Sequence, residues 1–230
     1  MTQPPAARPL SAHLKQITYG GNDGIVTTFA IVAGFAGAQA EGAGAIGALA
    51  VLVFGLANLL ADGLSMGMGE FLSTRSARAL YRAERGKALE AARGDGAALA
   101  GVLAARGLER ETAERAAKLL HEGPELVADL LAGAAVAMPD LRSARPVTDG
   151  LVTFLAFVSF GLVPLLPYLL AGPENASLGA SVAASFAALV ALGAIRARAT
   201  GEAAWRALAE VGGVGALCAA AAFAVGAVVG

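Results

Sequence analysis

The stretch AGAIGALAVLVFGLANLLADGLSMGMGEFL, residues 43–72, decides the fold. It is longer than the roughly 20 mostly apolar residues that a helix needs to cross a bilayer core of about 30 Å. Asp62 and Glu70 are its only charged residues. The sequence therefore predicts a transmembrane helix over Ala43–Leu72, and with it a membrane protein.

Four further segments satisfy the same length requirement. They are about Ile17–Ala40, Val147–Ala171, Ala176–Ile195 and Ala203–Gly230. Glu41-Gly42 and Gly172-Pro173-Glu174-Asn175 form two short turns between them. Only 15% of the residues are charged, against about a quarter in a soluble domain. We therefore expect an all-α polytopic membrane protein with five transmembrane helices.

Lysine and arginine placement predicts the orientation. All 17 of these residues, from Arg8 and Lys15 onward, fall on one side of the five-helix arrangement. The positive-inside rule puts that side, with the N-terminus, in the cytoplasm and the C-terminus outside. We expect a multi-pass protein of a cell inner membrane, in contact with lipid. The net charge of −1 argues against a nucleic-acid partner.

Residues 73–145 are too charged for lipid and too periodic for disorder, so they predict a cytoplasmic helical insert between the second and third spans. The chain then divides into residues 1–72, 73–145 and 146–230. Breaks are expected at Gly94-Asp95-Gly96 and Met138-Pro139-Asp140. The expected helices are Ser73–Arg93, which continues the second span, Ala97–Arg106, Glu109–His121 and Pro124 to about Val136.

Polar residues in a span mark a functional site by default. Asn58, Asp62, Met66 and Glu70 recur every four residues on the second span. Because four residues turn a helix by about 400°, they form one stripe about 18 Å long. Asp23 adds a carboxylate in the first span. We take these five residues as the candidate metal ligands.

Carboxylate and amide oxygens suit hard divalent cations, and a thioether adds a softer ligand. A site that contains Met66 therefore favours Fe²⁺ or Mn²⁺ over Mg²⁺ or Ca²⁺. Carboxylates in a medium of low dielectric constant can also exchange protons for a cation. Three of the five candidates have a plainer interpretation. Met66 could be a packing residue, Asn58 could form an interhelical hydrogen bond, and Glu70 could lie at the membrane interface. Asp23 and Asp62 are harder to explain in this way.

Other polar residues are expected to have structural roles. Asp149, beside Arg145, is expected to cap the third span at the interface. Glu210 is expected to pair with Arg206, one turn away. His13 and His121 are expected in solvated segments, and Cys218 is expected to pack in an apolar run. We expect no disulfide, no resident cofactor and no catalytic residue.

Three motifs resemble the vacuolar iron transporter family, which includes nodulin-21-like and prokaryotic members. They are NDGIVTTF at residues 22–29, LANLLADGLSMGMGEFLS at residues 56–73 and GLVPLLPY at residues 161–168. The resemblance implies a homodimer of five-helix protomers, with the metal path lined by the first helices at the dimer interface. It also implies export of Fe²⁺, often with Mn²⁺, from the cytosol in exchange for protons.

Position by position, Asp23 matches the family's essential aspartate and Met66 its methionine ligand. Asn58 stands where some members have a glutamate, and Asp62, one turn along, is the candidate to replace that charge. The insert departs from the iron-storing members, which have a glutamate row on its first helix and a Met-Met pair on its last. Here the first helix keeps Glu84 and Glu90, so a multi-metal site in the insert is not expected.

Two other classes of function compete with transport. A non-transporting membrane partner, descended from a transporter, is favoured by the sparse insert and opposed by the retained Asp23. An intramembrane enzyme is disfavoured, because the Gly-x-Gly-Asp signature of aspartyl proteases and a Gly-x-Ser-x-Gly nucleophile motif are absent. We therefore expect a transporter and not an enzyme.

Overall fold

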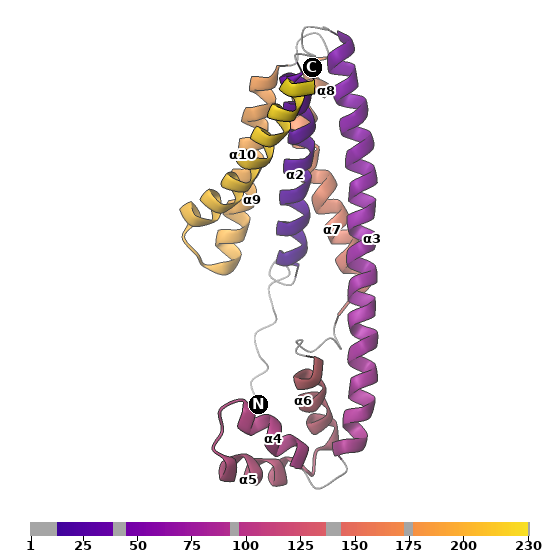
Figure 1. Ribbon diagram of the computed structural model, residues 1–230, viewed down its shortest axis with the longest axis vertical. Coiled ribbons are helices and arrows are strands. Elements are labelled where there is room, and N and C mark those ends of the chain that lie inside the picture. Colours follow the sequence, from indigo (N-terminus) through magenta and orange to yellow (C-terminus); the bar gives the residue numbers. More distant parts are fainter. Residues whose placement is uncertain (1–12, 39–44, 93–96, 137–143, 173–176, 230) are drawn as a thin grey trace. The chain divides into compact units, whose positions relative to one another are not determined.

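The computed structural model describes residues 13–38, 45–92, 97–136, 144–172 and 177–229. The described part is helical, with no strand, and forms two compact units (Figure 1). The first comprises Met1–Phe71 and Val147–Gly230, and the second comprises Leu72–Pro146. The predicted turns at Glu41-Gly42, residues 94–96, 138–140 and 173–175, and Arg8, lie outside the described residues.

Helices α2 (Leu14–Gly37), α9 (Leu178–Thr200) and α10 (Ala204–Val229) pack against one another in the first unit. Ile25 of α2, Leu192 of α9 and Val211 of α10 belong to one buried cluster. Ser177 caps α9 through its hydroxyl, which accepts a hydrogen bond of 3.2 Å from the backbone N–H of Ala180. Gly201, with φ of 75°, ends the helix in the left-handed region that glycine adopts without strain.

Helix α3 (Ala45–Ala92) is continuous for 48 residues. It therefore includes both the second predicted span and the helix predicted to continue it, so that prediction is confirmed. Every fourth residue from Val51 to Gly67 is buried. At this seam Gly67 meets Gly150, where a Cβ on Gly67 would lie 2.9 Å from the Gly150 carbonyl oxygen. These two glycines let the backbone of α3 contact the backbone around Gly150, as close packing of membrane helices requires.

The third predicted span is divided. Helix α7 (Pro146–Gly161) is followed by a 3₁₀ turn, η2 (Val163–Leu165), and by α8 (Leu166–Ala171). The apolar segment Pro146–Ala171 agrees with the predicted span over Val147–Ala171, but its helix is interrupted because Pro164 has no N–H and its ring disturbs the preceding turn. Ser181 of α9 donates a hydrogen bond of 2.6 Å to the Pro164 carbonyl oxygen, which satisfies an acceptor that the break exposes.

The second unit contains α4 (Ala97–Ala105), α5 (Arg110–Leu120) and α6 (Pro124–Val136), with the C-terminal part of α3. These bounds confirm the three predicted helices, and each end lies within one residue of its predicted position. Tyr81 of α3 is buried against Ala128 and Ala132 of α6. A second cluster joins Leu99 of α4 to Ala117 of α5.

Four segments of the described part are long and apolar enough to cross a membrane. They are α3, the segment Pro146–Ala171, α9 and α10. Helix α2 has 24 residues but is not among them. Its N-terminal half contains Asn22 and Asp23, which lower its hydropathy. The protein is thus a membrane protein with several apolar helices, and a fifth span through α2 stays a prediction.

Candidate metal path

The predicted stripe on α3 lies beside its buried seam. Asn58, Asp62 and Met66 are each half-buried, whereas Leu59 and Gly63, one position later, are fully buried. The stripe therefore borders the packed interface without being sealed inside it. Oxygen and sulfur atoms in that position are shielded from one side and remain reachable from the other.

Asn58 and Asp62 are bonded to each other. The Asn58 amide donates a hydrogen bond of 2.6 Å from Nδ2 to Oδ2 of Asp62. The neutral side chain that stands where some relatives have a glutamate thus holds the carboxylate one turn along. The structure therefore joins two of the five predicted ligands directly, Asn58 and Asp62 on α3. Asp23 lies on α2.

Asp23 has local support on its own helix. Thr27 Oγ1 lies 3.5 Å from Asp23 Oδ1, at the outer limit of a hydrogen bond. The adjacent Asn22 has a buried side-chain oxygen with no hydrogen-bond partner. A buried acceptor without a donor is costly, and a bound cation is one way to satisfy it.

In the described part of a single chain, no three His, Cys, Asp or Glu side chains converge in a way that holds a metal ion. Asp23 and Asp62 supply two carboxylates, and Met66 lies further along the same face of α3. Divalent cations of this class need about six ligands. One chain in this conformation therefore offers only part of a coordination sphere.

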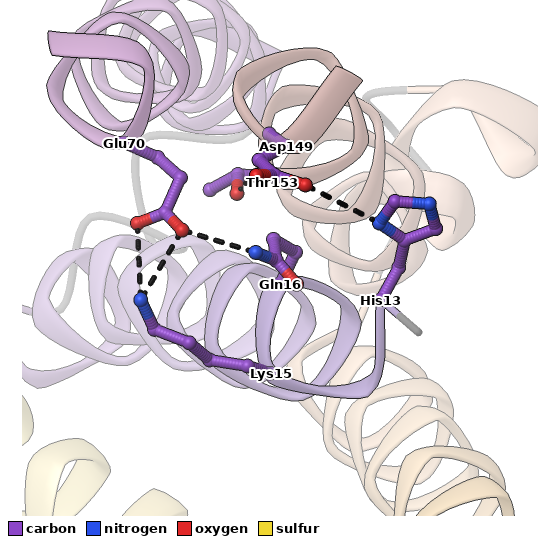
Figure 2. A network of polar contacts seen from close by, with 6 residues as sticks. All are labelled: His13, Lys15, Gln16, Glu70, Asp149 and Thr153. Atoms are coloured by element: carbon purple, nitrogen blue, oxygen red, sulfur yellow. Dashed lines mark hydrogen bonds and ion pairs between the residues drawn. The ribbon is translucent and has the colours of Figure 1, made fainter. Parts of the chain in front are cut away.

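Glu70, the last residue of the stripe, has different partners (Figure 2). Its side chain is only 12% exposed. Lys15 Nζ lies 3.2 Å from Oε1 and 3.4 Å from Oε2 of Glu70. Gln16 Nε2 donates a hydrogen bond of 3.0 Å to Oε1. Glu70 is therefore tied to the start of α2, at the other end of the stripe from Asn58.

A second polar contact lies beside it. His13 Nδ1 is 3.5 Å from Asp149 Oδ1, and Thr153 Oγ1 donates a hydrogen bond of 2.9 Å to the Asp149 carbonyl oxygen (Figure 2). The expectation of a solvated His13 is wrong, because the His13 side chain is only 28% exposed. Asp149 lies in the first turn of α7, at the start of the third predicted span, and its carboxylate faces the His13 ring.

Sequence reasoning missed Lys15 and Gln16. Gln16 precedes Asp23 by seven residues, which places both on one face of α2, and that spacing was the available signal. The prediction for Glu210 is also wrong. Glu210 Oε2 lies 2.8 Å from Arg196 Nη2 of α9, and Arg206 stacks on the Trp205 ring at 5.3 Å.

A groove of about 920 Å³ lies between α2, α3 and α10. Phe35, Phe54 and Val225 are among its lining residues, and Asn58 is the only polar side chain among those described. The polar stripe therefore borders a wide apolar groove at its Asn58 end.

Several carboxylates of the second unit are paired with cations. Arg85 of α3 bridges α6, donating to Asp129 at 2.6 Å and to Glu125. These bonds, to Asp129 first and Glu125 second, raise the pKa of Arg85 above its ordinary value, so it stays charged. Lys87 Nζ lies 2.6 Å from Glu84 Oε1. A guanidinium thus occupies the place between two helices where carboxylates converge.

Known proteins match this chain over most of its length. The chain is 29% identical to vacuolar iron transporter 2 of Oryza sativa over 91% of its own length and 85% of the relative's. It is 28% identical to vacuolar iron transporter 1 of Arabidopsis thaliana, over 94% and 86% of the two chains. A vacuolar iron transporter of Toxoplasma gondii is 31% identical over 69% of this chain and 53% of its own.

The match to a family model has the same extent. Residues 14–227, from the start of α2 to the end of α10, match the model of the VIT family. This range includes Asp23, the α3 stripe and the second unit. The chain belongs to the VIT family.

Proposed function

We propose that this protein exports Fe²⁺, and Mn²⁺ as well, from the cytosol in exchange for protons. The observation that carries the proposal is the bonded pair of Asn58 and Asp62 on the apolar helix α3, together with the carboxylate of Asp23 on α2. Relatives over most of the chain have the name vacuolar iron transporter.

The chemistry of these groups suits exchange. Carboxylates in a medium of low dielectric constant need positive charge beside them, either as protons or as a metal ion. Carboxylate and amide oxygens bind hard divalent ions, and the Met66 thioether favours a first-row transition metal over Mg²⁺ or Ca²⁺. A site that must hold either protons or a metal couples the two flows.

We further propose that the functional unit is a homodimer. The ligand set of one chain is incomplete in its described part, and the apolar groove between α2, α3 and α10 borders Asn58. A second copy seated on that groove covers the exposed apolar side chains and adds its own α2 ligands. Chemical crosslinking in native membranes, followed by mass determination, tests this assembly.

The proposed topology has five spans in a cell inner membrane, with lipid around them, the N-terminus in the cytoplasm and the C-terminus outside. The polar α2 is the fifth span, shielded from lipid by its neighbours. Fusions at the C-terminus test the count: alkaline phosphatase should be active there and a fluorescent protein dark. The opposite result leaves an even number of spans and contradicts the proposal.

Flux in proteoliposomes tests transport itself. Purified protein should move Fe²⁺ and Mn²⁺ into acidic vesicles faster than into vesicles without a pH gradient, and should alkalinise the lumen as it does so. Metal flux that is indifferent to the gradient removes the proton coupling and leaves a metal transporter.

The second candidate is a membrane protein that binds a partner and transports nothing. It is favoured by the incomplete ligand set and by the paired carboxylates of the second unit. A protein that inserts and dimerises normally, yet moves neither ion under any gradient, would establish this alternative.

A further inference from the structure

The end of the stripe at Glu70 has a built polar site. Glu70 is a carboxylate with 12% of its side chain exposed, and a buried charge is costly unless it is paired. Its partner in this structure is the Lys15 ammonium, which reaches both oxygens at 3.2 and 3.4 Å. The carboxylate thus already holds a cation, one that belongs to the protein.

Lys15 is a partner that can leave. Its side chain is 73% exposed, and ion pairs held by such exposed lysines are weak. The ammonium can move into water by rotating its flexible stem, without disturbing the packing of α2. Glu70, by contrast, stays in place because its helix is packed at Gly67 against α7.

Gln16 supplies a second, fixed group. It is 8% exposed, and its amide donates to Glu70 Oε1 at 3.0 Å. Its own oxygen, Oε1, is buried and has no hydrogen-bond partner. If Lys15 leaves, a half-turn of this amide places that oxygen beside the carboxylate. A carboxylate with an amide oxygen is a ligand pair for a hard divalent cation.

We propose that Glu70 and Gln16 form a loading site for divalent cations, and that Lys15 is a tethered counter-ion which the incoming cation must displace. The proposal rests on the proposed function in that the loaded ion is the transported one. His13 and Asp149 face the same region, and their side chains contact each other, with His13 Nδ1 3.5 Å from Asp149 Oδ1. One carboxylate and one amide make a weak site completed by water, as a site that must release its ion requires.

Mn²⁺ binding to the full-length protein tests this, measured by electron paramagnetic resonance in detergent. All variants have Asp23→Asn, so that binding deeper in the membrane contributes less. Lys15→Gln should raise the Mn²⁺ affinity by about two- to fivefold, the range expected for an exposed ion pair. Lys118→Gln, the same change on the exposed surface of α5, is the control and should leave the affinity unchanged.

A double-mutant cycle locates the effect. In a protein that also has Glu70→Gln, Lys15→Gln should no longer alter the affinity, because the carboxylate for which it competes is gone. Gln16→Leu, similar in size, should lower the affinity. Lys15→Arg keeps the positive charge and should bind Mn²⁺ no more tightly than the parent.

The proposal is overturned if Lys15→Gln behaves like Lys118→Gln, or if its effect persists without Glu70. An unchanged affinity in Gln16→Leu removes the amide as a ligand and overturns that half of the site. Because these titrations use a binding signal, they judge the loading site even if the wild-type protein proves not to transport. Absence of flux in proteoliposomes counts against the proposed function alone.

Discussion

Asp23 is the residue on which the proposed transport depends most. It lies on α2, and the resemblance places the family's essential aspartate at this position. Asp23→Asn keeps the shape and removes the charge that attracts a cation. We expect metal flux to be abolished while expression, insertion and dimerisation stay normal. Undiminished Fe²⁺ or Mn²⁺ flux in proteoliposomes would remove the residue from the path.

Met66 tests the softer ligand. Met66→Leu keeps the side-chain volume and removes the sulfur, so the loss of packing should stay below about 1.5 kcal/mol. If the thioether binds the ion, Fe²⁺ flux should fall while yield and melting temperature hold. Met68→Leu is a matched control, because Met68 is exposed at 55% on another face of α3. Equal flux in both variants would make Met66 a packing residue.

The stripe could be predicted from the sequence, but the partners of its last member could not. A spacing of four residues on one helix is local information, so the shared face of Asn58, Asp62 and Met66 was readable. The bond from Lys15 to Glu70 joins residues 55 apart in sequence. Glu210 likewise pairs with Arg196 and not with Arg206 because of how α9 and α10 pack. The periodicity of the sequence holds no information about that packing.

At the scale of elements, glycine contacts hold the helices close together. A Cβ on Gly67 would lie 2.9 Å from both the Gly150 oxygen and Phe154 Cβ, whereas Gly69, two residues on, has no described atom within 4 Å of that position. Gly67→Ala should therefore destabilise the protein by about 1–3 kcal/mol. Gly69→Ala should be neutral or stabilise it by up to about 1 kcal/mol. Thermal unfolding of both variants in one detergent decides; equal melting temperatures would contradict the contact.

Element boundaries were readable where local chemistry determines them. Pro124 opens α6 and Glu109 precedes α5, where a fixed φ and an acidic first turn favour helix starts. The break after Gly161 was missed because the segment stays apolar throughout, and hydropathy does not register a lost hydrogen bond. Pro164 was visible in the sequence, and because proline lacks an N–H and interrupts helices, it could have predicted the break.

At the scale of the whole molecule, two kinds of signal diverge at α2. The partition of 17 Lys and Arg residues favours five spans, whereas length and apolarity alone select four segments of the described part. The disagreement has a physical cause: α2 contains Asn22 and Asp23, and these polar residues lower its hydropathy. Charge placement does not depend on the hydropathy of α2, so it predicts five spans, and the fifth stays a prediction.

The ion pairs of the second unit bear on whether it could bind metal ions. Arg85 bridges Asp129 and Glu125, and Lys87 neutralises Glu84, so these carboxylates already have cationic partners. Glu84 and Glu90 are six residues apart and differ by about 240° around α3, so they face different ways. Hard cations need several oxygens converging on one point, and this arrangement does not supply them.

We therefore expect the full-length protein with Asp23→Asn to show no multi-metal binding in calorimetry with Fe²⁺ or Mn²⁺. Replacing Glu84 and Glu90 together by Gln should lower flux less than Asp23→Asn does. The matched control replaces Glu109 and Glu122, two exposed glutamates of the same unit, and removes the same charge. Two or more tight sites per protomer, lost in the first double variant and kept in the control, would show that the unit stores metal. Since Arg85 stays charged between its two carboxylates, such sites would first have to displace it.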